Sequence, residues 1–237
     1  MPPLVSTGAK LLRRLESRAL LALLAGAGAV WAFLAVGGEV REGEPLAYDA
    51  RILLAMRTPG DPNEPLGPPN IQEVLRDITA LGGFTILTLV TVIATIAFLL
   101  HHKARHALVL VATVLSAQIG SDVLKEFYGR PRPDLVPHGV HVYSASFPSG
   151  HSMLSATVYL TLAMLIASLA PRRGTKILLF VTALLVMTAV GISRVYLAVH
   201  WPSDVLAGWC AGAVWALVAW AALWRLEGGR PPDSRGG

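Results

Sequence analysis

Charged residues are scarce in this chain of 237 residues. Asp, Glu, Lys and Arg make up 15% of it and hydrophobic residues 54%, whereas an average chain carries about 25% charged residues. So little charge could hardly cover the surface of a soluble domain, which excludes an ordinary soluble protein. Cysteine is scarce too: Cys210 is the single one, so no intrachain disulfide can form. We interpret Cys210 as a small packing residue in an apolar run.

Long apolar runs are what the chain has instead. They approach the roughly 20 residues that cross a bilayer and predict an all-α integral membrane bundle of six transmembrane helices. The expected spans are Ala19–Val36, Phe84–Leu100, Ala107–Leu124, His151–Ala170, Ile177–Ile192 and Val205–Trp224. The first run follows a basic start, as in a signal peptide. It is long for that role and no clear cleavage motif follows it, so we interpret it as a span.

The net charge of +5 is a second clue to the topology. A nucleic-acid partner could explain it, but the Lys/Arg excess of cytoplasmic loops is the simpler explanation. The basic segments are residues 1–18, 101–106, 171–176 and a polar tail at 225–237 that we expect to be disordered. All four fall on one side of a six-span bundle. We therefore expect cytoplasmic termini, no nucleic-acid partner, and an outer face formed by 38–83, 125–149 and 193–204.

The turn at 101–106, HHKARH, holds three His. Adjacent His side chains do not converge on one ion without further ligands, so we expect a cytoplasmic anchor rather than a metal site. In the outer segment 38–83, helix-like spacing at Leu46–Arg57 and Ile71–Leu81 flanks a Pro/Gly-rich loop. These amphipathic segments could form a lid or lateral gate for a lipid. We favour the simpler role of covering the outer end of the bundle.

The stretch Ser193–Asp204, SRVYLAVHWPSD, places three polar residues between two apolar runs. Pro202 suits the first turn of a helix, where no N–H is needed. His200 should therefore lie on a loop before a helix, with Asp204 in the first helical turn. A carboxylate there can orient an imidazole that acts as a nucleophile. By themselves these residues also fit a membrane-surface loop with incidental polar groups.

The loop 125–149 begins KEFYGRPRP and crowds cations beside two prolines. Lys125, Arg130 and Arg132 form a rigid group of donors that suits a phosphate dianion. A basic loop that binds anionic headgroups is the alternative. These cations would lie on the outer face, where the positive-inside rule expects few Lys and Arg. Their presence there therefore indicates a local function.

The same loop ends FPSGHSM. Ser149 is expected to cap the fourth span, Gly150 allows close backbone approach, and the helix start is a ready anion site. His151 then stands in the first helical turn, beside that anion. His138 and His141 lie in the same loop, but only their proximity in the chain favours a catalytic role.

Together these three motifs resemble the three-part signature of the type 2 phosphatidic acid phosphatase (PAP2) superfamily, in order and intact over roughly residues 84–224. The motifs are Lys125-x6-Arg132-Pro133, Pro148-Ser149-Gly150-His151 and Ser193-Arg194-x5-His200-x3-Asp204. The resemblance implies three catalytic residues. His200 would become a phosphohistidine, Asp204 would orient it, and His151 would protonate the leaving oxygen. The implied phosphate-binding residues are Lys125, Arg132, Arg194, Ser149 and Gly150.

The resemblance also implies that no metal or other cofactor is needed. We therefore predict a membrane phosphatase of the bacterial inner membrane that hydrolyses undecaprenyl diphosphate, phosphatidate, phosphatidylglycerol phosphate or a similar lipid, with its site at the outer face. A lipid phosphotransferase and a non-catalytic lipid-binding homologue are the alternatives. Vanadium haloperoxidases share the signature, but they resemble soluble helical proteins, so the six expected spans argue against that class. The oligomeric state cannot be deduced from the sequence.

Overall fold

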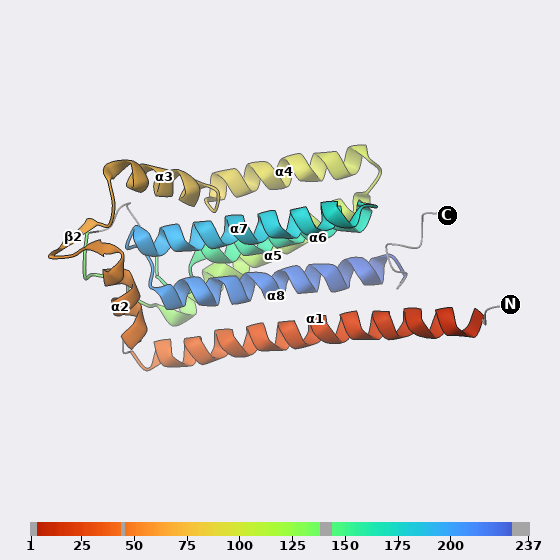
Figure 1. The fold of residues 1–237 in the computed structure, drawn as a ribbon, viewed down its shortest axis with the longest axis horizontal. Coiled ribbons are helices and arrows are strands. Elements are labelled where there is room, and N and C mark those ends of the chain that lie inside the picture. The colour runs from red at the N-terminus through yellow and green to blue at the C-terminus, as the bar shows by residue number, and fades with distance from the viewer. Residues whose placement is uncertain (1–3, 44–45, 138–143, 229–237) are drawn as a thin grey trace.

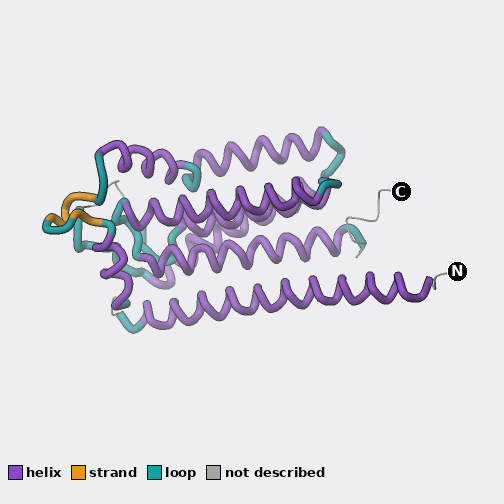
Figure 2. Tube along the Cα trace, viewed as in Figure 1, coloured by secondary structure: helices purple, strands orange, loops and turns teal. Residues whose placement is uncertain are grey.

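The computed structural model of the chain describes residues 4–43, 46–137 and 144–228, and only the backbone within 4–19. The described part consists of eight α-helices and a small β-hairpin (Figures 1 and 2). In chain order they are α1 (Leu4–Arg41), α2 (Ala47–Ala55), β1 (Arg57–Thr58), β2 (Asp61–Pro65), α3 (Pro69–Ala80), α4 (Phe84–Leu100), α5 (Ala104–Tyr128), α6 (Gly150–Leu169), α7 (Arg173–Tyr196) and α8 (Pro202–Leu226).

The long helices lie side by side, and two ends of the bundle can be distinguished in Figure 1. At one end, which we call the site end, α2, the hairpin and α3 gather. At the other, which we call the far end, lie both termini and the turns that join α4 to α5 and α6 to α7. The described parts of the four segments predicted to be cytoplasmic therefore share one end.

Five helices of the described part are long and apolar enough to cross a membrane, and the pair α3–α4, bent by 45°, is a sixth candidate. Each of the six predicted spans coincides with one of α1 and α4–α8. Large apolar side chains cover the lateral surface; Leu23, Trp31 and Leu100 are each at least 70% exposed. Such a surface suits acyl chains rather than water. The predicted all-α integral membrane fold is confirmed.

Two helix boundaries differ from the expected ones. Helix α1 begins at Leu4, so residues 4–18 of the basic segment form one helix with the first span. At the other terminus, α8 runs to Leu226. The tail that we expected to be disordered lies, from residue 229 onward, outside the described residues.

Helices α6 and α8 approach each other closely because α8 presents two glycines one turn apart. A methyl group built on Gly208 would lie 2.8 Å from the Ser149 carbonyl oxygen, and one on Gly212 would lie 2.5 Å from the Met153 carbonyl oxygen. This small-xxx-small spacing is typical of tight helix packing in membranes. It brings the first turns of α6 and α8, which carry the second and third motifs, side by side.

The segment 38–83 covers the site end, as predicted, but its centre is not a plain loop. Strands β1 and β2 pair antiparallel there, with a register irregularity after Arg57. The Arg57 Nη2 group donates to the Tyr196 carbonyl oxygen (2.7 Å), and the Tyr196 hydroxyl donates to the Leu66 carbonyl oxygen (2.8 Å). These bonds attach the hairpin to the end of α7.

Candidate active site

His200 lies on the short loop between α7 and α8 and is 2% exposed. The loop ends where predicted, because Pro202 is the first residue of α8 and Trp201 before it is extended (φ −69°, ψ 149°). Proline fixes φ at a helical value and needs no N–H partner, so it begins the helix at that residue. His200 is thereby held immediately before a helix start.

Asp204 lies in the first turn of α8 and is fully buried. Its Oδ2 accepts a hydrogen bond from the Trp201 backbone N–H (2.9 Å) and another from the Ser146 hydroxyl. The same oxygen lies 3.4 Å from the His200 Nδ1 atom. This distance is at the long end of the hydrogen-bond range. The predicted pairing of these two residues is present.

Arg132 contacts the opposite nitrogen of the same ring. Its Nη1 lies 3.3 Å from the His200 Nε2 atom and also donates to the Val199 carbonyl oxygen (2.7 Å). A guanidinium has donors only, so Nε2 must be the acceptor, and the ring proton belongs on Nδ1, opposite Asp204. This tautomer leaves the Nε2 lone pair directed toward the cations of the loop 125–149.

Burial lowers the pKa of the His200 imidazole to about 3, and the positive charges of Arg194 and Arg132 act in the same direction. The hydrogen bond and the charge of Asp204 raise the pKa but do not offset burial. The ring is therefore neutral across the physiological pH range. Burial also lowers the pKa of the Arg132 guanidinium, but a guanidinium keeps its charge in proteins.

The two other predicted phosphate-binding cations converge on this region from α5 and α7. The Lys125 ammonium donates to the Ala145 carbonyl oxygen (2.7 Å), and Arg194 donates through Nη1 to the Thr79 hydroxyl (3.0 Å). Arg194 is 4% exposed, and its Nε has no hydrogen-bond partner among the described residues. A buried donor of this kind is available to an anion.

Helix α6 begins at Gly150, and Ser149 caps it as predicted, with its hydroxyl accepting from the Ser152 N–H (3.4 Å). The Ser149 N–H donates to the Asp204 carbonyl oxygen (3.0 Å), which ties this helix start to that of α8. His151, in the first turn, lies close enough to Lys125, Arg132, Arg194 and His200 for their charges to act on it. All eight predicted site residues thus gather at the site end.

The bend between α3 and α4 reaches the same place. A methyl group built on Gly82 would lie 3.1 Å from the His151 carbonyl oxygen, and one on Gly83 would lie 3.8 Å from the His151 Nε2 atom. The Thr79 hydroxyl, one turn earlier, is the acceptor for Arg194. The segment 38–83 therefore contributes directly to the surroundings of the site.

Arg130 is placed differently from the sequence-based hypothesis, which grouped it with the phosphate-binding cations. It is 7% exposed and forms ion pairs with two buried carboxylates, Asp49 (2.9 Å) and Asp204 (2.6 Å). Both forks of the guanidinium are thus occupied by protein groups. We correct its role from anion binding to a contact with the aspartate that orients His200.

Sequence reasoning missed Asp49, Thr79 and Ser146. The sequence contained one signal for Asp49, because this residue lies on the same apolar stripe as Leu46 and Leu53. A carboxylate on such a stripe requires a buried partner. Thr79 and Ser146 carried no comparable pattern. His138 and His141 lie outside the described residues.

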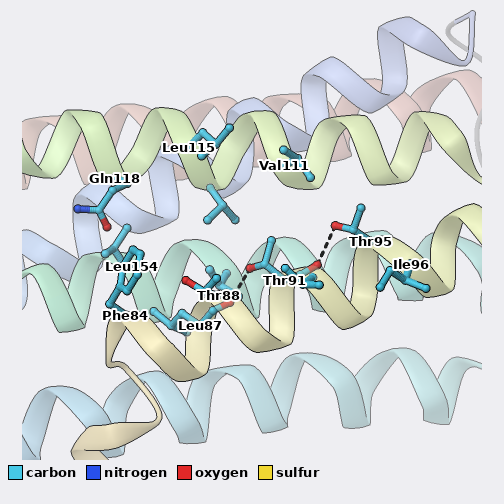
Figure 3. A pocket seen from close by; sticks show the side chains of 13 residues that line it. Phe84, Leu87, Thr88, Thr91, Thr95, Ile96, Val111, Leu115, Gln118 and Leu154 are labelled. Carbon is cyan, nitrogen blue, oxygen red and sulfur yellow. Dashed lines mark hydrogen bonds between the residues drawn. The ribbon is translucent and has the colours of Figure 1, made fainter.

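An apolar pocket of about 340 Å³ lies between α4, α5 and α6 (Figure 3). It begins close to the site, since Phe84 follows Gly83 and Leu154 is one helical turn beyond His151. In the close-up, Gln118 lies at the Phe84 end and Ile96 at the other. The lining residues are Phe84, Leu87, Thr88, Thr91, Val92, Thr95, Ile96, Val111, Val114, Leu115, Gln118, Leu154 and Val158. The Thr91 and Thr95 hydroxyls donate to carbonyls of α4 itself, so the pocket surface stays apolar.

Three comparisons with known proteins agree with this geometry. Phosphatidylglycerophosphatase B of Bacillus subtilis (strain 168) is 37% identical over 145 residues, which are 61% of this chain and 71% of that protein. Undecaprenyl-diphosphatase of Sulfolobus acidocaldarius is 35% identical over 68 residues, 29% of each chain. The crystal structure of a transmembrane PAP2-type phosphatidylglycerolphosphate phosphatase from Bacillus subtilis has a TM-score of 0.75 at 27% identity, covering 86% of this chain and 98% of that one.

The model of the PAP2 superfamily matches residues 106–227, which is more than half of the chain. The match begins in α5 and ends just after α8, so it includes all three motifs and every residue predicted to bind phosphate or act in catalysis. The chain belongs to the PAP2 superfamily, as an integral membrane protein.

Proposed function

We propose that the protein is a metal-independent phosphatase that hydrolyses a lipid phosphate or diphosphate through a phosphohistidine on His200. The contacts of the His200 ring carry this proposal: Asp204 lies 3.4 Å from Nδ1 and Arg132 lies 3.3 Å from Nε2. This pairing requires a neutral ring with an unprotonated Nε2. A neutral imidazole beside a set of cations is a nucleophile ready to attack a phosphorus that those cations hold.

In the first half-reaction, the Nε2 lone pair of His200 forms a bond to phosphorus, and the bond from phosphorus to the leaving oxygen breaks. His151, once it is protonated beside the bound phosphate anion, gives that oxygen a proton. Lys125, Arg132 and Arg194 neutralise the charge on the equatorial oxygens, and the start of α6 adds N–H donors. Asp204 keeps the Nδ1 proton in place and balances the positive charge that develops on the ring.

In the second half-reaction, water attacks the same phosphorus and the bond to His200 breaks. His151, now neutral, takes a proton from the water, as general acid–base catalysis in both directions requires. The products are inorganic phosphate and a lipid alcohol, or a lipid monophosphate if the substrate is a diphosphate.

The pocket between α4, α5 and α6 supports a lipid rather than a water-soluble substrate. It begins beside Gly83 and Leu154, next to His151, and continues along α4 as far as Ile96. Twelve residues of α-helix rise about 18 Å, which is comparable to the length of an ordinary acyl chain. We propose that a substrate chain lies in this pocket while its phosphate lies among the site cations.

Phosphatidylglycerol phosphate is our first candidate substrate. The relative that shares 37% identity over 145 residues is named a phosphatidylglycerophosphatase, and the crystal structure with TM-score 0.75 carries a matching description. Undecaprenyl diphosphate is the second candidate, because a relative matched over 68 residues is named for it.

The test is phosphate release by protein purified in detergent with a chelator present. Phosphatidylglycerol phosphate, phosphatidate and undecaprenyl diphosphate would be compared at equal concentrations. We expect release with at least one of them, and loss of turnover in His200→Ala. His101→Ala is the control, because this exposed His lies at the far end of the bundle and bonds to the Ala97 carbonyl oxygen; it should keep wild-type turnover.

Two results would contradict the proposal. Wild-type turnover in His200→Ala would exclude His200 as the nucleophile. Loss of wild-type activity on chelation would exclude the metal-independent mechanism. A direct test of the intermediate quenches the wild-type protein in alkali during turnover of a substrate labelled in its phosphate, since a phosphorus–nitrogen bond survives in alkali and breaks in acid. We expect a labelled protein that loses its label on acid treatment.

A further inference from the structure

A buried carboxylate of α2 contacts the start of α8. Asp49 is fully buried; its Oδ1 accepts from the Ser203 backbone N–H (2.8 Å), and its Oδ2 accepts from the Ser203 hydroxyl (2.5 Å). Ser203 is the second residue of α8, where backbone N–H groups have no partner within the helix. Asp49 therefore caps α8 from a segment that is more than 150 residues away in the sequence.

Arg130 joins this carboxylate to the one that orients His200. Its Nη2 donates to Asp49 Oδ2 (2.9 Å), and its Nη1 donates to Asp204 Oδ1 (2.6 Å) and to the Ser203 hydroxyl (2.7 Å). The guanidinium is planar, and its two forks point at two different carboxylates. We call these three residues the Asp49–Arg130–Asp204 chain.

Within the Asp49–Arg130–Asp204 chain, Arg130 contacts the carboxylate oxygen of Asp204 that does not face His200. Oδ1 is held by Arg130, while Oδ2 lies opposite His200 Nδ1 and accepts from the Trp201 N–H and the Ser146 hydroxyl. Fixing one carboxylate oxygen fixes the plane of the group and hence the position of the other oxygen. Partners of this kind determine how well an orienting group holds its ring.

The charges of the three residues also matter. Asp204 must remain negative to balance the positive charge that develops on His200 as Nε2 bonds to phosphorus. Arg130 by itself would cancel the charge of Asp204, because the two groups are 2.6 Å apart and buried. Asp49 supplies a second negative charge, so the three side chains of the Asp49–Arg130–Asp204 chain together keep a net charge of minus one beside the imidazole.

We propose that Arg130 and Asp49 are positioning residues for the reaction: through Asp204 they hold His200 and keep the charge that its phosphorylation requires. This inference rests on the proposed function, because it assumes that His200 is the nucleophile. It assigns a role in the chemistry to α2, which lies outside the part of the chain that matches the family model.

The test is a set of three variants that change the net charge in steps. Asp49→Asn brings it to zero, Arg130→Gln brings it to minus two, and the double variant restores minus one. We expect each single variant to lower kcat about 10- to 100-fold, the range typical of partners that orient metal-binding His residues, with KM within about threefold of wild type. The double variant should exceed Arg130→Gln in kcat by about tenfold or more.

A purely structural role makes a different prediction. Removing two buried partners would then weaken the protein more than removing one, and the double variant would be the least active. Arg57→Gln is the matched control, because Arg57 is also a buried Arg at the site end and bonds to a backbone carbonyl, that of Tyr196. It should lower the melting temperature while kcat stays within about twofold of wild type.

The outcomes separate the inference from the proposed function. If wild-type protein releases no phosphate from any lipid phosphate, the proposed function fails. If wild-type protein is active but the double variant is no better than Arg130→Gln, the inference fails. If Arg130→Gln does not fold, Asp49→Asn is the deciding variant. A wild-type kcat in Asp49→Asn, with or without a change in KM, would contradict the inference.

Discussion

Arg132 and Asp204 contact different nitrogens of one imidazole ring, and each contact has a distinct effect. The donor-only guanidinium at Nε2 requires a lone pair there, while the carboxylate at Nδ1 retains the ring proton. Burial then keeps His200 neutral by lowering its pKa to about 3. The tautomer, the charge state and the direction of the nucleophile all follow from these few contacts.

The low pKa of His200 makes folding stability depend on pH. The value in the folded protein, about 3, is below the usual value of about 6.5, so the unfolded chain binds more protons between these limits. The contribution of His200 to stability is complete above pH 6.5. It decreases by about 1.4 kcal/mol per pH unit as the pH falls from there toward 3.

We therefore expect the melting temperature of the wild type to fall more steeply than that of His200→Asn between pH 7 and pH 4. Both proteins would be measured in the same detergent, so all other titrating groups are shared. Parallel curves for the two proteins would show that His200 is not held neutral by burial.

At the scale of elements, the contact between α6 and α8 aligns the second motif with the third. Gly208 and Gly212 let the two backbones approach, and the Ser149 N–H reaches the Asp204 carbonyl oxygen (3.0 Å) across the junction. The distance between the His151 and His200 side chains thus depends on residues that touch neither of them.

Gly212→Ala should separate these helices. The added methyl group would lie 2.5 Å from the Met153 carbonyl oxygen and 2.6 Å from the Ala156 Cβ atom, neither of which can move without a backbone shift. We expect a loss of roughly 1–3 kcal/mol in stability, seen as a lower melting temperature, together with a kcat reduced about tenfold or more, because a small misplacement of reacting groups is costly.

Gly28→Ala in α1 is the matched control, because a methyl group there would have no neighbour within 4 Å. Its kcat should equal that of the wild type, and its melting temperature should be no lower, since Ala favours a helix more than Gly does. If Gly212→Ala behaved in the same way, the close approach of α6 and α8 would not be what aligns the site.

At the scale of the whole molecule, both termini and two turns lie at the far end, and the site lies at the opposite end (Figure 1). The far-end segments are basic, which predicts that they face the cytoplasm. The site would then open to the outside of the cell.

Cysteine labelling tests this orientation. In a Cys210→Ser background, Asn63→Cys in the hairpin and Gly174→Cys at the start of α7 both place a thiol at an exposed position. A membrane-impermeant maleimide added to intact cells should label the first and not the second, and both should react after the cells are opened. The reverse pattern would place the site on the cytoplasmic side.

The parts that could be predicted from sequence rest on local rules. Proline at position 202 and serine at position 149 set helix starts within one or two residues of themselves, and apolar length defines the spans. Because these starts fix where Asp204 and His151 emerge, the main site residues could be named from the order of amino acids alone.

The remainder depends on how distant segments meet. The ion pair of Asp49 with Arg130 joins residues 81 apart in the chain, and its existence depends on α2 folding back over the start of α8. The hairpin escaped prediction for a different reason, since the run DPNEP of β2 carries two prolines, which normally argue against a strand. It is tolerated here because the sheet has only two strands, and so both are edges.

The bend between α3 and α4 has a consequence for the surrounding lipid. Helix α4 has 17 residues, all of them apolar or Thr, and they correspond to about 25 Å, less than a hydrocarbon thickness of about 30 Å. This hydrophobic mismatch favours a bilayer that is locally thinner beside α4. Headgroups on that flank would lie deeper, closer to the level of His151 and to the entrance of the apolar pocket.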